Sequence, residues 1–116
     1  MRKKKEGRKF HRKKDQRRLL KKSLAFSLVD KERIETTLAK AKEVSSLVEG
    51  YITRAKKGDV ASRRILLECL PKKSVNKLFK EIAPRYKSRN GGYIRIIRKG
   101  RRKSDGAQIA IVELIK

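Results

Sequence analysis

Residues 33–58 read RIETTLAKAKEVSSLVEGYITRAKKG and contain the clearest structural pattern of the 116-residue chain. The first five, RIETT, alternate charged and β-branched residues, as is typical of a short strand. Apolar residues then recur at helical spacing as far as Ala55. Thr37 is a suitable N-cap, and Gly58, after two lysines, is a typical helix end. The pattern predicts a strand at 33–37 that leads directly into a long amphipathic helix ending at residue 57.

The expected buried stripe of this helix contains seven residues. They are Ala41, Val44, Leu47, Val48, Tyr51, Ile52 and Ala55. Because Tyr51 lies within the stripe, we expect it to pack in the core and not to stack on a base.

On the N-terminal side, Leu20, Leu24 and Leu28 recur every four residues. This spacing predicts a helix from about 15 to 30, with Asp15 as a possible N-cap. Residues 1–14, MRKKKEGRKFHRKK, offer almost nothing to bury and are expected to form a basic arm that orders on its partner. The predicted organisation is therefore an arm at 1–14 and a single domain at 15–116.

On the C-terminal side, two further helices are predicted. Asp59 caps the first, which runs to about Leu70 and ends at Pro71; its inward residues are expected to be Ala61, Ile65 and either Leu66 or Cys69. Ser74 caps the second, which ends at Pro84; its inward residues are expected to be Val75, Leu78, Phe79 and Ile82.

Two β-rich runs follow, Tyr93–Arg98 and Gln108–Ile115. The basic segment 99–107 between them contains two turn glycines, so the runs predict a long-looped antiparallel hairpin. The strand at 33–37 is too short to stand alone and should join this sheet, with helices on one face. The fold class is α+β, in the order α-β-α-α-α-β-β.

The formal net charge of +24 is concentrated in two blocks. Residues 1–22 carry net +11 and residues 85–104 carry net +9. Blocks of one sign favour a polyanionic partner, because Lys and Arg bind phosphate and release its counterions. Charge alone is compatible with RNA, DNA or an anionic membrane surface. A basic arm and a basic loop suit the space between packed RNA helices best.

Several function classes are not supported. The chain has one Cys and one His, and its acids are scattered, so neither a metal site nor a catalytic constellation is expected. No phosphate-binding Walker loop, cofactor site, small-molecule site or membrane span is apparent. No apolar stripe is left over for a homo-oligomer once the sheet is covered. The residues predict a non-catalytic protein.

Tyr86 and Tyr93 are the only aromatic residues in the second basic block. They are compatible either with stacking on unpaired bases or with packing under the loop. The Asn90-Gly91-Gly92 turn is compatible with a backbone concavity that holds a phosphate, or with an ordinary glycine turn.

Seven segments in order along the chain resemble the family of bacterial large-subunit ribosomal protein seventeen. The longest is LFKEIAPRYKSRNGGY at 78–93. The others are Met1-Arg2, Gly7-Arg8-Lys9, ERIETT at 32–37, AKAKE at 39–43, ITRAKKGD at 52–59 and AIVEL at 110–114.

The resemblance implies a structural protein of the 50S subunit that binds 23S ribosomal RNA near the polypeptide exit, in the cytoplasm. It also implies neighbouring large-subunit proteins as partners, and a two-layer sandwich with a three-stranded mixed sheet. The rival hypothesis is a free nucleic-acid chaperone or DNA-compacting protein.

The residues expected to contact RNA fall into four groups. The arm supplies Arg2, Lys3, Lys4, Lys5, Arg8, Lys9, Arg12, Lys13 and Lys14, and the first helix supplies Arg17, Arg18 and Lys21. The start of the long helix supplies Thr36, Thr37 and Lys40, and the two C-terminal loops supply Arg85, Lys87, Arg89, Asn90, Gly91, Arg101, Arg102 and Lys103.

Overall fold

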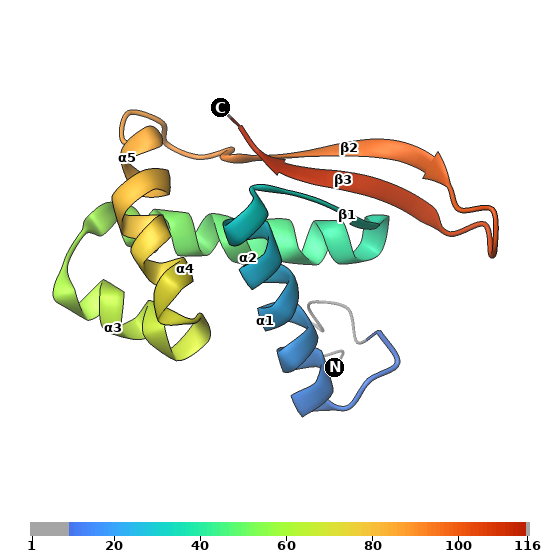
Figure 1. The fold of residues 1–116 in the computed structure, drawn as a ribbon, viewed down its shortest axis with the longest axis horizontal. Coiled ribbons are helices and arrows are strands. Elements are labelled where there is room, and N and C mark those ends of the chain that lie inside the picture. Colours follow the sequence, from blue (N-terminus) through green and yellow to red (C-terminus); the bar gives the residue numbers. More distant parts are fainter. Residues whose placement is uncertain (1–9, 116) are drawn as a thin grey trace, which may run out of the picture.

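The computed structural model describes residues 10–115, and Figure 1 shows its fold. The elements are α1 (Lys14–Lys31), β1 (Arg33–Thr37), α2 (Leu38–Lys57), α3 (Val60–Cys69), α4 (Lys72–Lys77), the π-helical turn η1 (Leu78–Ile82), α5 (Ala83–Arg85), β2 (Ile94–Arg101) and β3 (Gln108–Leu114). With α4, η1 and α5 taken as one helical segment, this order confirms the α+β prediction. The division into an arm and a domain stays a prediction, because most of the arm lies outside the described residues.

Both ends of α2 are as predicted. Thr37 caps it by accepting a hydrogen bond from the Lys40 amide at 3.5 Å. Gly58 ends it in the left-handed conformation, with φ of 70°. Only glycine adopts such a φ without steric cost, so this residue fixes the end of the helix.

The sheet has the strand order β1-β3-β2, and both pairings are antiparallel. The mixed sheet that the resemblance implied is therefore wrong. The helical segments between β1 and β2 bring the chain back so that these two strands run in the same direction. They do not pair with each other, because β3 lies between them and runs the opposite way.

The core lies between α2 and one face of the sheet, so that the described helices form one layer and the strands the other (Figure 1). Val44, Val48 and Ile52 of α2 are fully buried, as are Ala110 and Val112 of β3. Each large apolar side chain buried in this way contributes about 1.5–3 kcal/mol. Tyr51 is half-buried against this core, and burial, with Cys69 nearby, raises its pKa to about 12.

The structure corrects the predicted inward face of α3. Ala61 and Ile65 are exposed, whereas Ser62, Leu66 and Leu70 are buried. These three follow one another at intervals of four, which is the stripe that points toward α2 and α4.

The helix predicted to begin at the Ser74 cap and to end at Pro84 also differs at both ends. It begins after Pro71, so Ser74 lies inside α4 and is buried. Pro84 does not end it, because η1 continues into α5 across this residue. In η1 the amide of Ala83 bonds to the carbonyl of Leu78, which is the pattern of a π turn. This wider turn lets the helix continue at Pro84, which has no amide hydrogen to donate to the helix.

The start of α1 differs by two residues from the prediction. Its N-cap is Lys13, whose amide donates to Oε1 of Gln16 at 3.3 Å. Asp15 lies in the first turn instead, where its negative charge interacts favourably with the positive end of the helix dipole.

Ile52→Ala should lower the free energy of unfolding by about 2–5 kcal/mol, because the side chain is fully buried and its removal leaves a cavity. Ile65→Ala is the matched control, since Ile65 is 41% exposed and should change stability by about 0.5 kcal/mol at most. Urea unfolding followed by circular dichroism measures both. Equal losses in the two variants would contradict this account of the core.

Candidate nucleic-acid interface

The β2–β3 hairpin extends beyond the helical layer (Figure 1). The strand β2 reaches Arg101, three residues further than the predicted end at Arg98. An irregularity between Arg98 and Gly100 lets pairing resume, so that Gly100 opposes Ile109 and Arg101 opposes Gln108. Lys99 and Arg101 therefore lie on a strand and not in a loop.

A short loop closes the hairpin. The Arg102 amide bonds to the Ala107 carbonyl at 2.8 Å, and the Arg102 guanidinium pairs with Asp105 at 2.5 Å. This pairing, with the Ala107 amide, lowers the pKa of Asp105 to about 2. Asp105 is therefore ionised at physiological pH and offsets the charge of Arg102.

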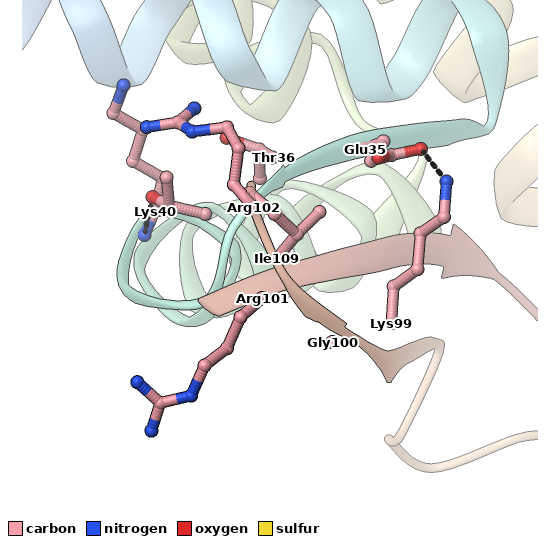
Figure 2. A pocket seen from close by; sticks show the side chains of 9 residues that line it. Glu35, Thr36, Lys40, Lys99, Gly100, Arg101, Arg102 and Ile109 are labelled. Atoms are coloured by element: carbon pink, nitrogen blue, oxygen red, sulfur yellow. Dashed lines mark hydrogen bonds and ion pairs between the residues drawn. The ribbon is translucent and has the colours of Figure 1, made fainter. Parts of the chain in front are cut away.

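An open hollow of about 500 Å³ lies between this hairpin and the start of α2. Figure 2 shows the side chains that line it. Its lining comes from the β1–α2 junction and from the two hairpin strands. The residues are Glu35, Thr36, Thr37, Lys40, Lys99, Gly100, Arg101, Arg102 and Ile109. The fold thus brings together two predicted groups that are about 60 residues apart in the sequence.

Of the four cationic side chains that line the hollow, Lys99 and Arg102 have a carboxylate partner. Lys99 bonds to Glu35 at 2.9 Å, and this pair is drawn in Figure 2. Among residues 10–115, no carboxylate pairs with Lys40 or Arg101, and Arg101 extends away from the Glu35–Lys99 pair. Unpaired cations around a polar hollow suit phosphate oxygens, which accept charge-assisted hydrogen bonds.

The loop from Tyr86 to Tyr93 forms a second basic surface, and its tyrosines are buried. Their rings are 5.1 Å apart, and they are 3% and 2% exposed. Tyr86 donates to the carbonyl of Ile115, and Tyr93 donates to that of Arg89 at 3.2 Å. The tyrosines therefore pack under the loop, which leaves no ring face for a base.

Lys56 at the end of α2 holds this loop. Its ammonium donates to the Arg89 carbonyl and, at 2.9 Å, to the Tyr93 hydroxyl. It also lies 5.0 Å from the centre of the Tyr93 ring. The Arg89 amide donates to the Tyr86 carbonyl at 3.0 Å, so within the turn at 89–92 the backbone donors left for a ligand are those of Asn90 and the two glycines.

The remaining predicted residues are dispersed. Arg85 pairs with Glu32 at 2.8 Å, so its guanidinium already has a structural partner. Lys21 pairs with Glu43 at 3.6 Å, and Arg18 lies 4.0 Å from Asp15. Exposed side chains without an acid partner in the described part of the chain are Arg12, Lys13, Lys14, Lys87, Arg89 and Lys103.

Arg17 is half-buried, and its Nε is covered without a hydrogen-bond partner in the described part of the chain. The predicted arm residues Arg2, Lys3, Lys4, Lys5, Arg8 and Lys9 lie outside the described residues.

Sequence reasoning missed Lys56 and Lys99, because each binds a residue that is distant in the sequence and close only in the folded protein. Lys56 reaches a loop 33 residues later, and Lys99 reaches a strand 64 residues earlier. The only local signal for Lys56 was its position in the last turn of a helix, where a lysine is ordinary.

Among residues 10–115, no group of three or more His, Cys, Asp or Glu side chains could hold a metal ion. None of the helices in that range is long and apolar enough to cross a membrane.

Comparison with known proteins gives a consistent result. The family model for ribosomal protein L17 matches residues 20–115. The large ribosomal subunit protein bL17 of Thermodesulfovibrio yellowstonii is 52% identical, over 94% of this chain and 83% of that protein. The bL17 proteins of Natranaerobius thermophilus and Staphylococcus aureus are 50% and 48% identical, each over 93% of this chain and 96% and 98% of their own lengths.

Lys56→Met should lower the free energy of unfolding by about 1.5–3 kcal/mol, because a charged donor to the Arg89 carbonyl and the Tyr93 hydroxyl is lost. Lys57→Met removes the same charge from an exposed position and should have little effect. Urea unfolding gives the stability, and amide exchange reports the loop at 89–93. Equal effects of the two variants would show that the loss of charge, and not the contact, is responsible.

Proposed function

Because the chain belongs to the ribosomal protein L17 family, we propose that it is a non-catalytic structural constituent of the bacterial large ribosomal subunit that binds and neutralises 23S ribosomal RNA. The family membership supports the large ribosomal subunit as the assembly that contains this protein. The net charge of +24 supports an RNA partner, since a polyanion would relieve the self-repulsion of the chain.

The observation that carries the RNA proposal is the hollow between α2 and the hairpin. There Lys40 and Arg101, from two distant segments, line the same hollow without an acid partner among the described residues, and the Arg101 side chain extends outward from it (Figure 2). Neither segment alone would fix two cations relative to each other. A phosphate of the RNA backbone fits this arrangement, because such contacts set position and orientation without reading the bases.

Three further parts of the proposal rest on the resemblance. They are the location near the polypeptide exit, the presence of protein neighbours in the 50S subunit, and a cytoplasmic, ribosome-bound state. The charge-rich surface and the buried tyrosines are compatible with recognition of RNA shape, since no aromatic platform for bases is exposed at the loop.

Sedimentation tests the function directly. A tagged chain in bacterial lysate should travel with the large subunit at low salt and remain there after a moderate salt wash. A chain that stays at the top of the gradient, or leaves with DNA, would contradict the proposal and favour a free nucleic-acid chaperone or DNA-compacting protein.

The double variant Lys40→Ala/Arg101→Ala should bind a 23S ribosomal RNA fragment more weakly and reduce the slope of log affinity against log salt by up to about 2, because each lost phosphate contact removes about one unit. Filter binding at several salt concentrations measures this. Arg64→Ala/Lys72→Ala removes the same charge from exposed positions outside the predicted set and should leave the slope nearly unchanged. Equal slopes for the two double variants would contradict a contact at the hollow.

Asp105→Asn should strengthen binding to the same RNA at low salt, because it removes the carboxylate that offsets Arg102. The asparagine carbonyl can still accept from the Ala107 amide, which Asp105 Oδ1 now does at 3.1 Å. Glu68→Gln makes the same charge change on an exposed part of α3 and is the control. A gain no larger than that of the control would place Arg102 away from the RNA.

A further inference from the structure

The sheet has an outer face that the described helices do not cover (Figure 1). The register sets its residues, because alternate side chains point away from α2. Those of β3 are Ile109, Ile111 and Glu113, opposite the buried Ala110, Val112 and Leu114. Their neighbours on the same face are Arg33, Glu35 and Thr37 of β1, and Arg95, Ile97 and Gly100 of β2.

Isoleucines form the centre of this face. Ile97 is 39% exposed, and it lies directly opposite the half-buried Ile111. Ile109, also half-buried, continues the strip toward the hollow described above. Branched apolar side chains left partly in water on a flat surface are typical of a place where another macromolecule packs.

The charges of this face are paired, unlike those of the hollow. Glu113 accepts from Arg95 at 2.9 Å and lies 3.7 Å from Arg33. Glu35 accepts from Lys99 at 2.9 Å, and this bond crosses over β3. Two carboxylates thus offset two of three bases around the isoleucines, which leaves this patch near neutrality in a chain of net charge +24.

We propose that this outer face of the sheet docks a neighbouring protein of the large subunit, which covers Ile97 and Ile111 with apolar side chains. The proposal rests on the proposed function. A protein bound to the same RNA needs cations for the same reason as this chain does, so the two would repel at most of their surfaces. The face with paired charges and an apolar centre is where such a neighbour can approach, and it has the low-charge centre and arginine-containing rim of a protein interface.

The same observations disfavour two other occupants. RNA gains little from cations that a carboxylate already offsets, and it gains nothing from isoleucine. A second copy of this chain would bring another net charge of +24 to the contact. The Glu35–Lys99 bond therefore marks a boundary, with the RNA-facing hollow on one side and the protein-facing patch on the other.

Site-specific photo-crosslinking in purified large subunits tests the proposal. A benzophenone amino acid replaces Ile97 in one variant and Arg95, which is 60% exposed, in a second. Both positions should crosslink to the same large-subunit protein, in an adduct that survives ribonuclease and is identified by mass spectrometry. The control replaces Lys103 at the hairpin loop, which should crosslink to RNA.

Adducts to RNA at positions 95 and 97, to a second copy of the chain, or to nothing would overturn the docking proposal. Each of those results would be obtained from variants already incorporated into large subunits, so the proposed function would stand. Failure of the wild-type chain to enter the particle would instead overturn the proposed function, and this inference with it.

Discussion

The apolar contact between α2 and the inner face of β3 holds together segments that their charges push apart. Val44, Val48 and Ile52 pack where Ala110 and Val112 are buried, and they belong to one core that also contains Leu28 and Leu78 of the other helices. Because α2 begins directly after β1, this contact also fixes the β1–α2 junction against the hairpin. The hollow, the outer face and the loop that Lys56 holds all follow from that one placement.

The acids of this chain determine which bases are available. Glu35, Glu113, Asp105 and Glu32 each pair with a lysine or an arginine from another part of the surface or from the same turn. Exposed ion pairs contribute little to the free energy of folding. Their main effect is to determine which lysines and arginines on the surface remain unpaired. In the proposed arrangement, unpaired cations face RNA, and the surface with paired charges faces protein.

Local signals predicted the elements well and the contacts between them poorly. Thr37 and Gly58 bound α2 by short-range chemistry that a sequence shows directly. The antiparallel order, the inward stripe of Ser62 and Leu66 and the passage of the helix across Pro84 depend on neighbours that are far away in sequence. The candidate site divides in the same way. Lys40 and Arg101 were predicted one by one, but their meeting at a single hollow, and the part that Lys99 plays there, required the fold.

The central strand of the sheet is the last element of the described chain. During synthesis, β1, α2 and β2 leave the ribosome before Gln108–Leu114 does, so the two outer strands have no pairing partner until then. The sheet therefore forms late, since β3 supplies the pairing for both neighbours together with the buried residues Ala110, Val112 and Leu114. A deletion of these seven residues would take away the whole sheet and not merely one edge of it.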